Sequence, residues 1–146
     1  MRDQQFDMEI TMKRFTILPV LLAVSLVATV AFAASDRKIT ASFETLSNSG
    51  ISGQAELQSM PKGGTLVHEQ IRGLVPNTQY VSIVYGNGTC GSEAASAANV
   101  VARFTANANG IANFTQQVGK DLVTIQSVSI QLASDLSVQA CAPVTQ

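Results

Sequence analysis

The chain has 146 residues, with 9 Lys and Arg against 10 Asp and Glu, for a formal net charge of −1 at neutral pH. Charged residues make up 13% of the chain, and no cluster of basic side chains follows the pattern that binds a phosphate backbone, which excludes nucleic acid as the expected partner. Once an N-terminal export segment is set aside, roughly 110 residues remain, enough for one domain with one modest core.

The N-terminal region has the layout of a secretory signal peptide. Lys13 and Arg14 precede an apolar run over residues 15–32, and small residues at 31–34 close it. A membrane anchor is the alternative interpretation, but Pro19 interrupts the run, which is at the short end for a spanning helix. The pattern favours a cleaved signal, after which no stable membrane anchor remains.

We expect residues 1–33 to be the signal-peptide region, with Met12 as an alternative natural start, and residues 34–146 to form a single domain that is secreted or periplasmic. Disulfide bonds form and persist in such oxidising compartments. The two cysteines of the chain, Cys90 and Cys141, are therefore predicted to form a disulfide bond rather than a catalytic pair.

Alternation of apolar and polar residues with a period of two dominates from residue 38 onward, and helical periodicity is hard to find. Each alternating segment places one face in the core and one in water, as a half-buried antiparallel strand does. The first four predicted strands cover residues 39–44, 51–58, 65–72 and 79–85. Sequences rich in Gly, Asn, Ser and Pro lie between them and predict turns.

The next segment is predicted to be a loop followed by a hairpin. Residues 86–98 are rich in Gly, Ser and Ala, and Cys90 gives this irregular connection an anchor. The hairpin is expected to run from residues 100–104 through a turn at 107–110 to residues 111–118.

Two further strands, at residues 123–132 and 137–142, bring the total to about eight. Short strands at this spacing predict an all-β fold of antiparallel strands. We expect a Greek-key β-barrel or an immunoglobulin-like sandwich.

Three local matches span nearly the whole expected domain. The first is Gly-Leu at 73–74, followed by the strand at 80–85 and by Gly-Asn-Gly-Thr-Cys at 86–90. The second is Phe-Thr-Ala-Asn-Ala-Asn-Gly-Ile-Ala at 104–112, and the third is Val-Gln-Ala-Cys-Ala-Pro-Val at 138–144. Taken in this order, they resemble the copper/zinc superoxide dismutase family: its copper-ligand strand with the disulfide cysteine, one of its hairpins, and its C-terminal Ala-Cys strand. The resemblance implies that family's β-barrel and supports the same disulfide.

The resemblance also implies that the chain lacks the family's metal chemistry. The family's two copper-binding histidines on the fourth strand correspond to Ser82 and Val84, and its late histidine falls near Ile130. Its zinc-ligand loop has no counterpart in residues 91–98, where Glu93 is the one charged group. Imidazole or soft ligands hold a redox-active copper ion, so we expect no metal ligand, no cofactor and no catalytic residue.

The single histidine of the chain, His68, lies on the third predicted strand. It is in phase with Gln70, whereas Val67 and Ile71 take the other face, so a solvent-exposed side chain is favoured over a metal ligand. The alternative is weak metal binding together with Glu69, but no second imidazole or free thiol completes such a site.

The remaining acidic side chains are interpreted as solvated groups on strand faces and turns rather than as acid–base pairs. These residues are Glu44, Glu56, Glu69, Asp121 and Asp135. The chain also has no Gly-x-Ser-x-Gly elbow and no recognisable partner for its histidine. We therefore predict that it is not an enzyme.

Tyr80 and Tyr85 flank the strand that carries the copper ligands in the resembling family. If exposed, they would form a small binding surface, because a tyrosine offers contact area and a polar tip together. The favoured alternative is that one packs in the core and the other pairs across the sheet.

The sequence thus predicts a secreted or periplasmic domain that resembles a superoxide dismutase without its metal site. We expect a non-catalytic binding or structural module, with an envelope or extracellular protein as the class of partner. One alternative is a divergent copper/zinc superoxide dismutase with non-standard ligands, such as His68 with carboxylates. Another is a surface adhesion or matrix module, for which a large exposed apolar patch would be the structural sign.

Overall fold

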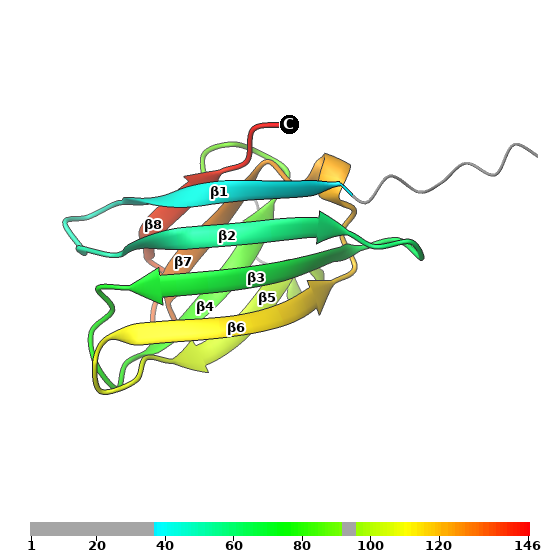
Figure 1. Ribbon diagram of the computed structural model, residues 1–146. Helices are drawn as coiled ribbons and strands as arrows, with labels where there is room; N and C mark the ends of the chain where they lie inside the picture. Colours follow the sequence, from blue (N-terminus) through cyan, green and yellow to red (C-terminus); the bar gives the residue numbers. More distant parts are fainter. Residues whose placement is uncertain (1–36, 92–95) are drawn as a thin grey trace, which may run out of the picture. The chain divides into compact units, whose positions relative to one another are not determined.

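The computed structural model describes residues 37–91 and 96–146, so the predicted signal peptide and Glu93 lie outside the described residues. Within the described ranges the chain forms eight antiparallel strands and two short 3₁₀ helices (Figure 1). The strands are β1 (Lys38–Thr45), β2 (Ser52–Ser59), β3 (Thr65–Arg72), β4 (Gln79–Tyr85), β5 (Val100–Thr105), β6 (Ile111–Val118), β7 (Ser127–Leu132) and β8 (Val138–Pro143). The 3₁₀ helices are η1 (Ala97–Asn99) and η2 (Leu122–Thr124). The prediction of an all-β fold with about eight antiparallel strands is confirmed.

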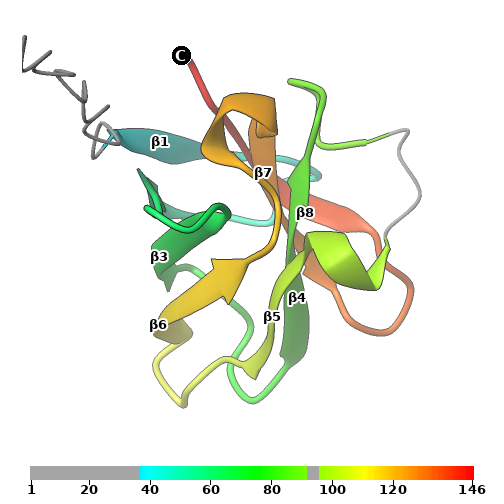
Figure 2. The same cartoon turned by 90° about the vertical axis from the view of Figure 1, so that its right-hand side faces the viewer.

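The strands lie in two layers (Figures 1 and 2). One layer contains β1, β2, β3 and β6, and the other contains β5, β4, β7 and β8. The layers are continuous on one side, because β1 pairs with β2 along most of its length, whereas Glu44 and Thr45 at its end pair with Cys141 and Ala140 of β8. The hydrogen-bonded order is β5-β4-β7-β8-β1-β2-β3-β6, a nearly closed Greek-key barrel. We call the gap in this order, between β5 and β6, the open side.

The predicted hairpin over residues 100–118 is wrong, although its turn is present. β5 pairs with β4, and β6 pairs with β3, so the two strands belong to different layers. In the turn, the side-chain oxygen Oδ1 of Asn107 accepts the backbone N–H groups of Asn109 and Ile111, both at 2.9 Å. The local sequence therefore predicted the reversal of the chain correctly but not the pairing of the strands that it joins.

Contacts with the β3–β4 connection explain why the turn at 107–110 leads from one layer to the other instead of forming a hairpin. The backbone N–H of Leu74 donates to the carbonyl oxygen of Gly110, and the N–H of Ala106 donates to that of Thr78, both at 3.0 Å. The two crossing segments therefore satisfy each other's backbone groups. Gly110 has a φ of +68°, and a Cβ there would lie 2.3 Å from the carbonyl oxygen of Leu74, so the close approach requires glycine.

The strand predicted at residues 123–132 begins later, at Ser127. Residues 122–124 instead form η2, which buries Leu122 and leaves Val123 63% exposed, and Ile125 is again buried. Burial of residues three apart fits a 3₁₀ turn better than a strand. No helix in the described part of the chain is long and apolar enough to span a membrane.

Side chains from the inward faces of the strands fill the barrel interior, and the predicted disulfide bond is present. The largest aliphatic side chains inside include Leu57, Ile71 and Ile130, which are almost fully buried. The bond between Cys90 and Cys141 links the loop after β4 to β8, with an S–S distance of 2.00 Å and Cα atoms 5.8 Å apart. The disulfide prediction is confirmed.

Candidate functional site

The residues at the copper-ligand positions of the resembling family do not fit a copper site. Ser82 and Val84 on β4 and Ile130 on β7 are completely buried, and their side chains face the barrel interior. The outward-facing neighbours Val81 and Ile83 carry no ligating atom either. Neither face of β4 therefore offers the imidazole or soft donors that a redox-active copper ion requires.

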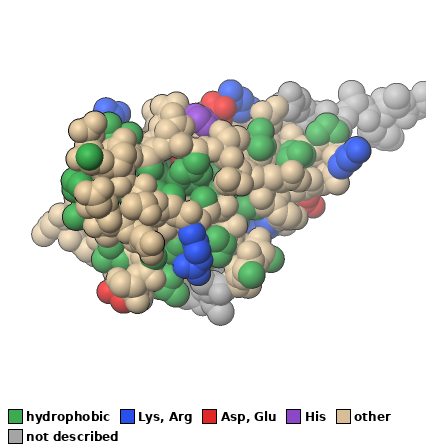
Figure 3. All heavy atoms as spheres, turned by 90° about the horizontal axis from the view of Figure 1, so that it is seen from below, with side chains coloured by type: hydrophobic (Ala, Val, Ile, Leu, Met, Phe, Trp, Pro, Cys, Tyr) green, Lys and Arg blue, Asp and Glu red, His purple; other side chains and the backbone are tan. Residues whose placement is uncertain are grey.

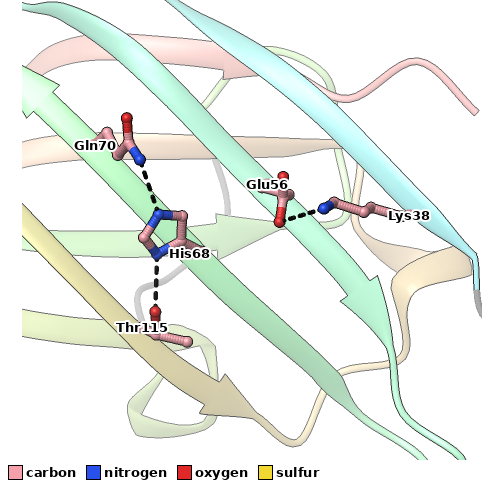
Figure 4. A network of polar contacts seen from close by, with 5 residues as sticks. All are labelled: Lys38, Glu56, His68, Gln70 and Thr115. Carbon is pink, nitrogen blue, oxygen red and sulfur yellow. Dashed lines mark hydrogen bonds and ion pairs between the residues drawn. The ribbon is translucent and has the colours of Figure 1, made fainter.

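His68 points outward from β3, as its phase in the sequence predicted. Its Nδ1 lies 2.8 Å from Oγ1 of Thr115, and its Nε2 lies 3.1 Å from Nε2 of Gln70 (Figure 4). The same layer carries an ion pair at its surface, with 2.8 Å between Nζ of Lys38 and Oε1 of Glu56. Among the residues described, no three His, Cys, Asp or Glu side chains are grouped closely enough to hold a metal ion.

Glu69 is the residue that the sequence interpretation placed wrongly. It is completely buried, on the same face of β3 as Val67 and Ile71. It therefore cannot bind the same metal ion as His68, whose side chain points outward. The hydroxyl of Ser82 donates to Oε1 of Glu69 at 2.5 Å, whereas the buried Oε2 has no hydrogen-bond partner. The two residues form a polar pair among the mostly apolar side chains of the barrel interior.

Burial raises the pKa of Glu69 from 4.5 to about 8, and the hydrogen bond from Ser82 opposes this shift with a smaller effect. The carboxyl is therefore neutral at pH 7. The other four acidic residues considered above lie at the surface, as predicted, since none of them is buried. Asp135 is an example, because the backbone N–H and the hydroxyl of Ser137 donate to its carboxylate and lower its pKa.

Neither tyrosine forms the surface that one interpretation required, because Tyr80 is 2% exposed and Tyr85 is 3% exposed. The hydroxyl of Tyr80 accepts the backbone N–H of Val75 at 3.0 Å inside the barrel. The hydroxyl of Tyr85 accepts from Nε2 of Gln131 at 2.5 Å on the outer face of the β4 layer. Their positions agree with the favoured alternative, in which one tyrosine packs in the core and the other pairs across the sheet.

The outer face of β4 forms a second apolar cluster. Val81, Ile83 and Tyr85 are buried there and pack against Val100 at the start of β5. A recess of about 370 Å³ lies over this cluster, with Arg103 and Leu136 among its lining residues. The sequence analysis missed this surface because its residues come from three separate segments. The mostly apolar segment 80–85, which only Ser82 interrupts, is the signal that could have indicated a strand buried on both faces.

The loop that follows β4 is fixed beside this face by more than the disulfide. The backbone N–H of Cys90 donates to Oγ of Ser127 at 3.2 Å, and the hydroxyl of Ser127 donates to the carbonyl oxygen of Asn87 at 2.6 Å. The start of β7 thus organises the loop through its backbone. The fold and these contacts define a disulfide-linked, eight-stranded Greek-key barrel with a recess on the outer face of β4 and β5. No known family model matches the chain, and no curated protein matches it.

Proposed function

We propose that the chain is a non-catalytic binding module of an oxidising compartment, secreted or periplasmic, and that the recess over β4 and β5 is its binding surface. The observation that carries this proposal is the composition of β4, which places apolar side chains on both faces. Val81 and Ile83 form an apolar floor beneath a surface recess, which is typical of binding sites. The resemblance to copper/zinc superoxide dismutases supports a degenerate member in which such a surface replaces the metal centre.

The Cys90–Cys141 bond supports the choice of compartment, because protein disulfides persist where the surroundings are oxidising. The signal-peptide pattern over residues 1–33 supports it independently.

The rim of the recess indicates the chemistry of the partner. Leu136 is 44% exposed, and Arg103 has no ion-pair partner among the described residues. An apolar side chain with a nearby carboxylate would complement this combination. An envelope or extracellular protein segment that carries both is the partner that we propose.

Metal loading tests the non-catalytic part of the proposal. The purified chain, incubated with copper and zinc salts and then desalted, is expected to retain less than stoichiometric metal and to show no superoxide turnover, because the ligand positions hold Ser82, Val84 and Ile130. Elemental analysis and a superoxide-consumption assay on the same sample measure both quantities. Stoichiometric copper with turnover would establish the divergent dismutase instead.

Site-specific cross-linking tests the proposed binding surface. A photoreactive phenylalanine at Leu136 is expected to capture a defined partner in the native compartment, and Arg103→Glu in the same chain is expected to reduce capture at least tenfold. Val75 is the matched control position, since it is 60% exposed and lies outside the recess. Equal capture from positions 75 and 136, or capture that Arg103→Glu leaves unchanged, would contradict the proposal.

A further inference from the structure

Glu69 and Ser82 bridge the two layers of the barrel beside its open side. Glu69 lies on β3 directly opposite Phe114 of β6, and Ser82 lies on β4 directly opposite Ala102 of β5. Their hydrogen bond therefore joins the two strands to which the edge strands β5 and β6 are attached.

Aromatic side chains, rather than a backbone ladder, close the open side. In the described part of the chain, β5 and β6 are the two ends of the hydrogen-bonded strand order and do not pair with each other. The ring centroids of Phe104 and Phe114 lie 4.8 Å apart across this gap, and the ring of Tyr80 stacks on Phe104 at 5.9 Å. Figure 3 views the side on which β5 and β6 lie in Figure 1, and it shows hydrophobic side chains in the middle of this face with isolated charged groups around them.

No charge inside the barrel compensates that of an ionised Glu69. The residues directly opposite it are Ala55 on β2 and Phe114 on β6, and the residue that contacts it from β4 is Ser82. The described interior side chains of β1, β5, β7 and β8 are also uncharged, and Tyr80 of β4 is the other titratable group there. The neighbouring His68 on β3 and Arg103 on β5 are instead at the surface.

We propose that Glu69 and Ser82 form a protonation-dependent latch on the open side of the barrel. With Glu69 neutral, the two layers stay closed between β5 and β6. When Glu69 loses its proton, the layers separate there, and water reaches the carboxylate between Phe104 and Phe114.

The location of the opening follows from the cost of breaking each contact. A buried carboxylate with one hydrogen bond and one unpartnered oxygen gains hydration when the layers separate. Separation anywhere else would break a backbone ladder, whereas separation of β5 from β6 breaks no ladder and costs the ring contacts and the Glu69–Ser82 hydrogen bond. The pKa of Glu69 is about 8 in the closed barrel and near 4.5 when the group is exposed, so opening becomes more favourable as the pH rises between these values and levels off above about 8.

A tryptophan reporter measures the opening directly, because the chain has no tryptophan of its own. Phe104→Trp places the reporter on the open side, and Phe43→Trp places a control inside the barrel on β1, which is paired with neighbours on both sides. Between pH 6 and pH 9 we expect quenching by acrylamide to rise at least threefold at position 104 and to stay constant at position 43. An equal rise at both positions would indicate general loosening and overturn the latch.

Two substitutions separate the latch from other effects of pH. Glu69→Gln removes the titrating group and keeps its size, so quenching at position 104 is expected to become independent of pH. Ser82→Ala removes the hydrogen bond that joins the layers and that favours the ionised form of Glu69 in the closed barrel, so quenching at position 104 is expected to begin to rise at lower pH than in the wild type. A rise that persists in Glu69→Gln, or that moves to higher pH in Ser82→Ala, would overturn the proposal.

A measurement on the unmodified chain keeps the test independent of these variants. Carbon-13 NMR of the glutamate carboxyl groups follows the titration of each side chain. We expect Glu69 to titrate more than one pH unit above the ordinary glutamate value of 4.5. Titration of Glu69 at that ordinary value would show that its carboxyl is hydrated in the native state, and the latch would then be excluded.

Discussion

Replacement of Cys90 and Cys141 together by alanine is expected to lower the free energy of unfolding by about 4 kcal/mol, a value that follows from loop-closure entropy. The two cysteines are 51 residues apart, so the bond removes a large part of the freedom of the unfolded chain. Alanine leaves no unpaired polar group at these two buried positions. The measurement is urea unfolding of the double variant and of the oxidised chain at the same pH.

The double variant is expected to keep its native loop, because Ser127 still accepts from the backbone N–H of residue 90 and donates to Asn87. The loss of stability should be accompanied by a steeper dependence of the free energy of unfolding on urea concentration, since the unfolded variant is less compact and exposes more surface. Oxidised wild-type chain treated with reductant serves as the control and should match the double variant. Equal unfolding midpoints with and without the bond would show that the unfolded chain is already constrained between these positions.

The strands were predictable because most of them are buried on one face only. β3 illustrates this, since its predicted range of 65–72 agrees with the observed one. β4 was predicted as a strand together with the others, but it departs from their pattern, because it packs against the interior with one face and against a second cluster with the other. Where burial follows a different period, as in η2, the strand prediction failed.

Strand pairing was less predictable than the strands themselves. The Asn-Ala-Asn-Gly turn at 107–110 meets the local requirements of a hairpin. Its partner in the structure is the β3–β4 connection, which is about 30 residues earlier in the chain and satisfies the backbone of Ala106 and Gly110. A local pattern cannot show such a contact, so the open side of the barrel could not be predicted from the sequence.

The burial of Glu69 could not be predicted from the sequence either. Phase alone places Glu69 with Val67 and Ile71, but burial of a carboxyl is costly, so the residue type favoured a solvated position. The structure accommodates it with one hydroxyl, that of Ser82, which comes from another layer. The disulfide was predictable because the chain has two cysteines and its N-terminal sequence has the pattern of a signal peptide.

The free energy of unfolding of the wild-type chain, compared with that of Glu69→Gln, is expected to fall as the pH rises from about 4.5 to about 8. Below pH 4.5 the carboxyl is protonated in both the folded and the unfolded chain. Between the two values the folded chain retains a proton that the unfolded chain has lost, so each pH unit lowers the stability by about 1.4 kcal/mol. Above about pH 8 both states are ionised and the difference is constant, at about 5 kcal/mol below its acidic value.

Urea unfolding of both chains at intervals of one pH unit measures this difference, and Glu56→Gln is the surface control. Glu56 is part of an exposed ion pair with Lys38, so its removal should change the stability by less than about 1 kcal/mol and leave the pH dependence intact. Parallel profiles for wild type and Glu69→Gln would contradict the buried, neutral state of Glu69. The latch adds a further constraint. Once the native barrel opens, Glu69 is hydrated and ionised in the native state as in the unfolded chain, so the free energy of unfolding stops falling with pH. The pH at which the profile levels off must therefore coincide with the pH at which quenching rises at position 104.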